Sequence, residues 1–337
     1  GYDKIPTTII DDQMPPQRGN PSLDLEERTR DLLVALGLRE NISYRLTTVE
    51  REALLVPPGA ESSLPKADYV LLENPIASDK VAMRHTILAN LLTNAQNNAR
   101  YADRQQTFEI GAVYLAHADQ LLPDEPRRLG LLMTGTRYPV GWMKEGVTEG
   151  NVDFFDLKGV IEELLESLRI GNVSYARAAH TTYHPGRSAL LKVGETEIGV
   201  FGELYPLVAE RFGLSDAAVL VGEFDLDALL SFVPDVVKIR KLPVTPPVLQ
   251  DIALVVKEET SAEAVQAVIV EAGGDLLKAV RLFDVYQGGS IPEGHKSLAY
   301  SLTYQTDDRT LTDDEVARVH ARIVRTAERQ LGAKLRA

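Results

Sequence analysis

Apolar residues recur at helical spacing in three segments of the chain before residue 170. The first segment runs from Asp24 to Leu36 and is followed by Gly37, a residue that is typical of helix ends. The other two segments cover residues 87–99 and 156–168. The apolar stripe of the first segment consists of Leu25, Leu32, Leu33 and Leu36. We therefore expect three amphipathic helices in this part of the chain.

Runs of alternating apolar and polar residues predict strands around these helices. The expected strands cover residues 42–47, 107–115, 129–134, 188–193, 197–205 and 218–224. A loop with Gly and Pro is expected over residues 139–150. Mostly consecutive strands, with helices between groups of strands, favour an antiparallel sheet backed by helices over alternating βαβ units. The pattern therefore predicts an α+β fold.

Two segments lack any periodicity and mark the limits of this first module. Residues 1–21 are rich in Pro, Thr, Asp and Gln, so we expect an extended lead-in segment there. Arg240 to Pro247 contains three prolines in eight residues, which makes it the clearest linker in the chain. We therefore place a module at residues 22–235, a linker at 236–247 and a second domain at 248–337.

The second domain has a distinct order of predicted elements. Strand, helix, strand, strand, helix and strand are expected over residues 251–257, 261–272, 277–286, 296–304, 313–330 and 333–336. This βαββαβ order is that of the ferredoxin-like split fold, in which both helices cover one face of the sheet. The other face of the sheet is then left open.

The open face is predicted from the alternation of side chains in the two central strands. Leu282, Asp284 and Tyr286 are expected on the side opposite Phe283 and Val285. In the following strand the bulky residues are expected under the helices, which leaves small and polar residues on the open face. These are Ser297, Ala299, Ser301 and Thr303. A hairpin over the intervening loop puts Tyr286 opposite Ser297 and Asp284 opposite Ala299.

A small, polar face with one aromatic is typical of a surface that binds single-stranded RNA. A base can stack on Tyr286, which is worth about 1–3 kcal/mol, while Asp284 and Ser297 can hydrogen-bond to base edges. The alternative is a solvated face without a ligand. Four arginines at helical spacing are further candidates, for contacts to the RNA backbone, or else form a solvated basic face. They are Arg318, Arg322, Arg325 and Arg329.

The charge and composition exclude several classes of protein. A net charge of −13 argues against a general nucleic-acid coat protein, whereas acidic and basic residues balance from Val236 to Ala337. Any RNA contact is therefore expected in the second domain. The chain has no cysteine, which excludes disulfides, thiolate catalysis and Cys-based zinc sites. No membrane segment or signal peptide is visible, so we expect no membrane partner and a cytoplasmic location.

Eight motifs, in order along the whole chain, resemble the β subunit of bacterial phenylalanyl-tRNA synthetase. They are GYDKIP at 1–6, MRHT at 83–86, DFFDLKG at 153–159, HPGRSA at 184–189, FGELYP at 201–206, DIALVV at 251–256, LFDVY at 282–286 and RTLT at 309–312. The resemblance implies the C-terminal portion of that subunit, with a class II synthetase-like module followed by a ferredoxin-like anticodon-binding domain. Gln250 stands where the family commonly has Arg, so one backbone contact is expected to be lost.

The resemblance also implies partners and roles for residues. Asp284, Tyr286 and Ser297 match positions expected to contact the anticodon of tRNA(Phe). The expected assembly is α2β2, with an α subunit and a second β subunit, and the leucine stripe of the first helix is a candidate subunit interface. The alternative is that the stripe packs only on this chain's own sheet. ATP and Mg²⁺ are expected to serve the whole enzyme, with no cofactor on this chain.

Catalysis by this chain is not expected. Class II synthetases use two arginines to stabilise phosphate charge, but Leu115 and His117 stand where the first motif would have its Arg and Glu, and residues 222–230 contain no Arg. His180 and His184 lack the helical context and the Glu of a zinc site. Arg84 is expected in a structural ion pair rather than as a phosphate ligand.

Three hypotheses for the function therefore stand. The first is a non-catalytic subunit part that binds tRNA and the α subunit. The second is an independent enzyme, which would need the two missing arginines. The third is a ferredoxin-like regulatory module that binds a small amino acid.

Overall fold

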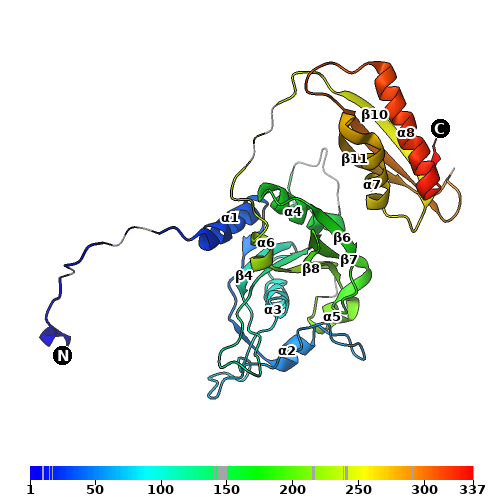
Figure 1. Ribbon diagram of the computed structural model, residues 1–337. Helices are drawn as coiled ribbons and strands as arrows, with labels where there is room; N and C mark the ends of the chain where they lie inside the picture. The colour runs from blue at the N-terminus through cyan, green and yellow to red at the C-terminus, as the bar shows by residue number, and fades with distance from the viewer. Residues whose placement is uncertain are drawn as a thin grey trace. The chain divides into compact units, whose positions relative to one another are not determined.

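Two compact units form the computed structural model, residues 1–237 and residues 238–337 (Figure 1). The structure describes all residues except 10, 15, 17, 140, 143–149, 215, 216, 238, 240, 241, 290 and 337. Most of the loop expected over residues 139–150, and the start of the proline-rich linker at 240 and 241, lie outside the described residues.

A seven-stranded sheet organises the first unit, in the order β1-β4-β5-β9-β8-β7-β6. Its strands are β1 (Arg39–Glu40), β4 (Gln105–Ala112), β5 (Arg127–Thr134), β6 (Val173–Arg177), β7 (Tyr183–Val193), β8 (Thr196–Leu204) and β9 (Val219–Asp225). Neighbouring strands are antiparallel except for the parallel pair β1 and β4. The expected α+β class with an antiparallel sheet is confirmed.

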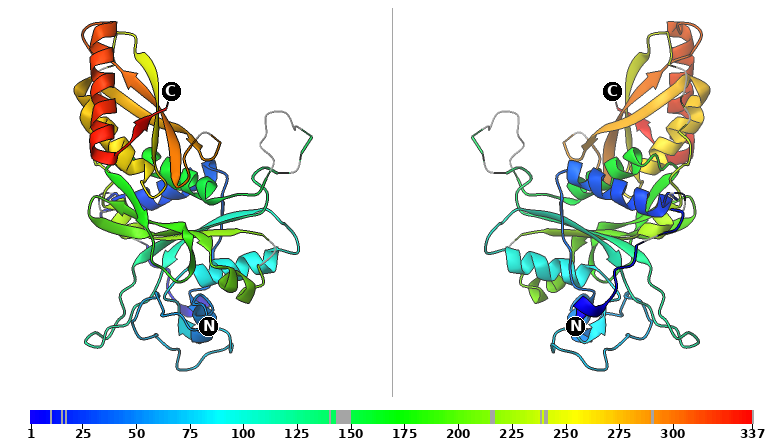
Figure 2. Two further views of the ribbon diagram at one scale, coloured as in Figure 1. Left: turned by 90° about the vertical axis from the view of Figure 1, so that its right-hand side faces the viewer. Right: turned by 90° about the vertical axis from the view of Figure 1, so that its left-hand side faces the viewer.

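Helices cover both faces of this sheet. The helices of this unit are α1 (Pro21–Ala35), α2 (Val49–Ala53), α3 (Leu88–Asn98), α4 (Phe154–Ser167), α5 (Pro206–Arg211) and α6 (Leu226–Leu230). A short 3₁₀ turn, η1 (Tyr2–Lys4), precedes them and buries none of its residues. Leu131 packs in the core under α1 and α4, whereas its neighbour Leu132 packs in the core with α3 and α5. Because adjacent residues of a strand point to opposite faces, α3 and α5 lie across the sheet from α1 and α4 (Figure 2).

Two short strands depart from the sequence-based expectation. The strand expected over residues 42–47 is reduced to β2 (Leu46–Thr47), which pairs with β3 (Ala82–Met83) in a separate two-stranded sheet. The main sheet instead takes up Arg39 and Glu40, which pair with Thr107 and Phe108 of β4. Two-residue strands carry too little periodicity to be found in a sequence.

The second unit has the expected ferredoxin-like βαββαβ order. Its elements are β10 (Val248–Lys257), α7 (Ala262–Gly273), the 3₁₀ turn η2 (Gly274–Leu276), β11 (Leu277–Tyr286), β12 (His295–Tyr304), α8 (Asp313–Leu331) and β13 (Lys334–Leu335). The strand order is β11-β12-β10-β13, and every pair is antiparallel. Leu254, Tyr300 and Ile323 belong to a core that joins the sheet to α7 and α8. Both helices thus pack on one face.

The long helix α8 is defined by strong signals at its two ends. Glu315 accepts hydrogen bonds from the backbone and hydroxyl of Thr312, in a capping box. Arg309 donates two further bonds to the same carboxylate, which lowers the pKa of Glu315 to about 2. At the other end Gly332 adopts the left-handed conformation (φ 61°) that closes a helix.

Candidate nucleic-acid interface

The register of β11 and β12 brings the predicted RNA-binding residues together. Tyr286 lies opposite Ser297, and Asp284 lies opposite Ala299, as the sequence predicted. One detail of the prediction was wrong, however. A β-bulge between Leu282 and Asp284 inserts an extra residue, so Leu282 pairs with the core residue Tyr300 and packs on the helix side. The bulge directs Asp284 to the open face without Leu282.

The floor of the open face is made of small side chains. In β10, Ala253 and Val255 alternate with core residues and lie opposite Ala299 and Ser297 of β12. Neither helix of this unit covers these residues in the described part of the chain, because α7 and α8 both pack on the other face. Small side chains leave room for larger groups to lie along this part of the sheet.

The three predicted contact residues differ in accessibility. The carboxylate of Asp284 is exposed, and Tyr286 is 38% exposed. Ser297 is only 2% exposed, although it lies on the open face. The guanidinium carbon of Arg336 lies 4.8 Å from the centre of the Tyr286 ring, in a cation–π contact. Asp284 is thus directly accessible, Tyr286 is partly exposed with Arg336 against its ring, and Ser297 is covered.

The four candidate arginines of α8 lie away from Tyr286. They project from a helix that covers the opposite face of the sheet. Arg322 donates hydrogen bonds to the carbonyls of Ala272 and Gly273 at 2.6 and 3.1 Å, so it caps the C-terminus of α7. Arg318 bonds to the carbonyl of Asp314, one turn earlier on its own helix. A ligand that contacts both this helix and Tyr286 has to pass around the edge of the sheet.

One of these arginines borders a groove at that edge. Arg325 lines it together with His320 of α8, Gln250 and Asp251 of β10, and Leu335 of β13. Arg329 lies in the last turn of α8 and is exposed. Contacts of Arg318, Arg322, Arg325 and Arg329 to RNA stay a prediction.

The leucine stripe of α1 packs within its own unit. Leu33 is fully buried, and three partly buried leucines pack against the same core. These are Leu25, Leu32 and Leu36. The packing is that of the alternative considered from the sequence, in which the stripe covers this chain's own sheet. A subunit interface on α1 stays a prediction and has to include its exposed face, where Leu23 and Val34 are 49% and 53% exposed.

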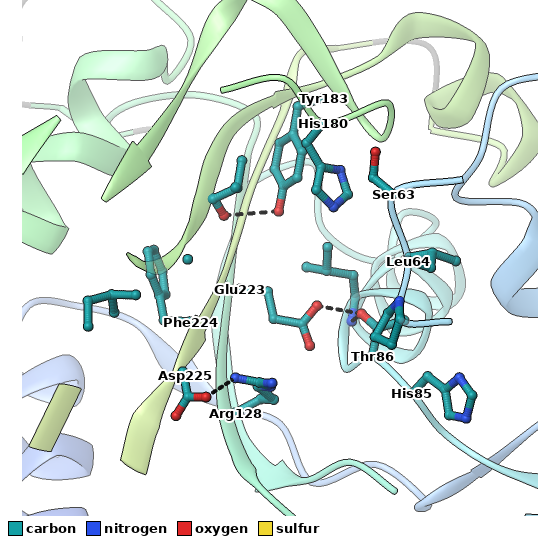
Figure 3. Close-up of a pocket in the computed structure, with 15 residues that line it drawn as sticks. Ser63, Leu64, His85, Thr86, Arg128, His180, Tyr183, Glu223, Phe224 and Asp225 are labelled. Carbon is teal, nitrogen blue, oxygen red and sulfur yellow. Dashed lines mark hydrogen bonds and ion pairs between the residues drawn. The ribbon is translucent and has the colours of Figure 1, made fainter. Parts of the chain in front are cut away.

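A cavity of about 210 Å³ in the first unit is lined by several polar side chains (Figure 3). Glu223 of β9 accepts hydrogen bonds from the Thr86 hydroxyl at 2.5 Å and from the Ile87 backbone at 3.0 Å. Burial raises the pKa of Glu223. His180 lies at one end of the cavity, and burial lowers its pKa to about 4. Arg128 is paired with Asp225 at 2.5 Å.

These groups mainly hold the fold together. Thr86 and Ile87 immediately precede α3, which has no side-chain cap of its own at Ile87, so Glu223 supplies the cap from a distant strand. The expected ion pair of Arg84 is confirmed. Its guanidinium bonds to Glu109 at 2.5 Å, and both side chains are almost fully buried. Among the described residues no group of three or more His, Asp or Glu side chains is placed to hold a metal ion.

The positions expected to lack catalytic residues lie in ordinary structural surroundings. Leu115 forms an isolated β-bridge with Asp124, and His117 is paired with the Asp124 carboxylate at 2.6 Å on the exposed side of this turn. His184 accepts a hydrogen bond from the backbone of Gly186. No helix in the described part of the chain combines the length and apolar character needed to cross a bilayer.

The sequence interpretation missed Arg336, Glu223 and the bulge at Phe283. Arg336 has a weak signal: it follows the short strand β13 two residues after Lys334, and extended backbone there puts both residues on the same face. For the cap by Glu223 we find no local signal, because its partners are more than 130 residues away. The bulge has no signal in the sequence, because no glycine or proline stands at residues 282–284.

Comparisons with known proteins agree with the two units. The model of the phenylalanyl tRNA synthetase beta chain CLM domain matches residues 5–226, and that of the ferredoxin-fold anticodon binding domain matches residues 243–336. A solved pyrrolysyl-tRNA synthetase from Desulfitobacterium hafniense covers 62% of this chain and 67% of its own, at 19% identity and a TM-score of 0.46. That similarity is too loose to add to the assignment.

Three similar curated proteins have the same name. Phenylalanine–tRNA ligase β subunits from Symbiobacterium thermophilum, Moorella thermoacetica and Clostridium acetobutylicum are 40%, 39% and 34% identical over all of this chain. The chain spans 37%, 41% and 40% of their lengths. Because the first family model alone matches well over half of the residues, the chain belongs to the family of phenylalanyl-tRNA synthetase β chains.

Proposed function

We propose that this chain is a non-catalytic part of a phenylalanine–tRNA ligase and that its open sheet face binds the anticodon of tRNA(Phe). The observation that carries the proposal is the exposed Tyr286, beside the exposed carboxylate of Asp284, on the face opposite α7 and α8. This face lies in the segment that matches a ferredoxin-fold anticodon binding domain.

Each residue has a distinct role in this proposal. The ring of Tyr286 stacks on a base, which is sequence-tolerant because every base has a π-face. Asp284 accepts hydrogen bonds from amino or imino groups on a base edge and supplies the discrimination. Ser297 lies opposite Tyr286, and its hydroxyl group, which is buried in this structure, bonds to the same nucleotide once it becomes exposed. The arginines of α8, above all Arg325, contact the phosphate backbone.

The chemistry of aminoacylation belongs to the α subunit in this proposal. Residues 22–235 form an inactive class II synthetase-like module, residues 236–247 a linker and residues 248–337 the anticodon-binding domain, in an α2β2 assembly located in the cytoplasm. ATP and Mg²⁺ are bound outside this chain. Leu115 supports the inactive module because it stands where a class II synthetase would have its first arginine, and β9 and α6 contain no arginine for the second. The carboxylates of Glu223 and Glu109 bond to other residues of this unit.

The test compares two exposed aromatic residues of the same strand. Tyr286→Ala is expected to weaken binding of tRNA(Phe) about 5- to 150-fold, the equivalent of about 1–3 kcal/mol of stacking. Phe283→Ala is the matched control. Phe283 is also an exposed aromatic of β11, at 54%, but it is the extra residue of the bulge and has no partner residue in β12. The chain is mixed with the α subunit, and tRNA affinity and aminoacylation are measured.

Three results would contradict the proposal. Unchanged affinity and unchanged aminoacylation with Tyr286→Ala would remove the anticodon assignment. Amino-acid activation by this chain alone would overturn the inactive module. A response of 3-fluorotyrosine at position 286 to free phenylalanine, without any response to tRNA, would favour the regulatory module instead.

A further inference from the structure

Two residues from opposite edges of the four-stranded sheet meet across its open face. Tyr286 ends β11 at one edge, and Arg336 follows β13 at the other edge. Strands β12 and β10 lie between them, yet the Arg336 guanidinium carbon is 4.8 Å from the centre of the Tyr286 ring. The two side chains therefore lie across the face rather than project from it.

The residues beneath this contact are small. Arg336 donates its backbone N–H to the carbonyl of Ala253 at 2.9 Å, and Ala253 pairs with Ala299 in β12. Tyr286 lies opposite Ser297, which pairs in turn with Val255. The arginine and tyrosine side chains thus pass over alanine, serine and valine, which leave room for them.

The burial of Ser297 is a second observation that agrees with side chains lying over this part of the face. Ala299, Ser301 and Thr303 lie on the same strand and the same face, and all three are partly accessible. Ser297 is only 2% exposed. It is the residue of this row that lies directly opposite Tyr286, so its burial agrees with a ring and a guanidinium that lie over this end of the row.

The loop after β11 fixes the far end of the ring. Gly289 adopts the left-handed conformation (φ 58°), and a Cβ atom there would lie only 2.5 Å from the Tyr286 hydroxyl oxygen. The glycine therefore makes space for the hydroxyl group. With the hydroxyl against this turn and the guanidinium over the ring, one face on which a base could stack is already occupied.

We propose that Arg336 is a further RNA-contacting residue, which occupies the stacking surface of Tyr286 in the RNA-free chain and turns to a phosphate when a base replaces it. This rests on the proposed function of the same face. A guanidinium suits the exchange, because it is planar, stacks on aromatic rings like a base, and binds phosphate in a bidentate manner. Uncovering Ser297 then adds its hydroxyl group to the site.

Other charged groups on this face are consistent with the exchange. Lys334 lies opposite Val255, and Arg281 lies opposite Ser301, so both share the open face with Arg336. Asp251 and Asp284 are the carboxylates of the same face. A phosphate that approaches the edge formed by β13 meets Lys334 and Arg336 first.

The first arm of the test needs no RNA. The full chain is labelled with 3-fluorotyrosine, and the Tyr286 resonance in ¹⁹F NMR is assigned by its loss in Tyr286→Phe. Arg336→Gln is expected to shift this resonance, whereas Lys334→Gln, two residues earlier on the same face, leaves it in place. An unchanged resonance in Arg336→Gln would overturn the contact. Circular dichroism checks that each variant is folded.

The second arm measures binding of an anticodon stem-loop at several salt concentrations. Arg336→Gln is expected to weaken binding roughly fivefold at about 0.1 M salt and to reduce the slope of log affinity against log salt by about 1. Arg336→Lys keeps the charge and is expected to restore the slope. Lys66→Gln, an exposed lysine of the first unit, serves as the control that leaves both values unchanged.

The outcomes separate this proposal from the proposed function. If the wild-type chain binds the stem-loop but Arg336→Gln binds with the same affinity and slope, Arg336 is not an RNA contact, while the anticodon assignment stands. If the wild-type chain does not bind the stem-loop or tRNA(Phe), the proposed function fails and the exchange fails with it. The ¹⁹F resonance then still shows whether Arg336 and Tyr286 touch.

Discussion

The two sheets of this chain differ in how their faces are covered. Helices pack on both faces of the seven-stranded sheet, whereas α7 and α8 leave one face of the four-stranded sheet open. In the first unit Arg84 is paired with Glu109, and Glu223 bonds to Thr86 and Ile87 at the start of α3. Asp284 and Tyr286 of the second sheet are accessible. Similar residue types thus stabilise the fold in one unit and are available for recognition in the other.

The strongest way to break this contrast is to remove one partner of the buried ion pair. Arg84→Met leaves the Glu109 carboxylate buried without its partner, which is expected to cost about 3–5 kcal/mol of unfolding free energy in the first unit. Calorimetry measures the loss. Affinity for the anticodon stem-loop is expected to stay unchanged, because the open face belongs to the other unit.

A double substitution is the control for that experiment. Arg84→Met combined with Glu109→Leu removes both charges, and most of the lost stability is expected to return. A double variant as unstable as the single one would mean that Arg84 stabilises the fold through its bond to the Ala112 carbonyl rather than through the ion pair.

The helix α1 offers a sharper comparison between adjacent residues. Leu33→Ala is expected to cost about 2–5 kcal/mol, because Leu33 is fully buried in the first core. Val34→Ala, at a residue that is 53% exposed, is expected to change stability by no more than about 0.5 kcal/mol. Urea unfolding gives both values. If Val34→Ala instead weakens association with the α subunit, the exposed face of α1 is the interface.

The pH dependence of stability is expected to be a smaller effect than Arg84→Met or Leu33→Ala. Burial raises the pKa of Glu52 to about 7, although Tyr69 and the His85 backbone donate hydrogen bonds to it. The folded state then holds a proton that the unfolded state releases near pH 4.5. Stability is therefore expected to fall as pH rises from about 4.5 to 7, by up to about 3 kcal/mol.

Replacement of that carboxyl group isolates its contribution. Glu52→Gln cannot titrate, so its unfolding free energy is expected to vary less over the same pH range than that of the wild type. Urea titrations at several pH values measure the difference. Identical slopes in both proteins would assign the pH dependence to other groups, such as Glu223, whose pKa is also raised by burial.

The sequence predicted those parts of the fold that repeat a local pattern. The three long helices, the βαββαβ order and the register of Tyr286 with Ser297 follow from periodicities of 3.6 and 2. The bulge at Phe283 breaks the period-2 pattern without a glycine or proline to mark it. Strand β6 (Val173–Arg177) was also missed. Its five residues are partly buried or exposed, so the run is too short and too mixed to predict a strand.

The rest of the site depends on contacts that no local pattern encodes. Arg336 meets Tyr286 only because the sheet order brings β13 and β11 to opposite edges of one small-residue floor. The burial of Ser297 follows from that contact and not from its own strand, where alternation predicts an accessible hydroxyl group. Alternation thus identified the face correctly but could not reveal that part of it is covered.

The cap that Glu223 provides for α3 also limits how early α3 can be completed during biosynthesis. Thr86 and Glu223 are separated by 137 residues, and a ribosome adds about 5–20 residues per second. The first turn of α3 therefore waits about 7–27 s after its own synthesis before its cap is made. During that interval β5 also lacks its neighbour β9 and presents an unpaired edge. The nascent first unit is thus expected to need protection from aggregation until residue 225 has left the ribosome.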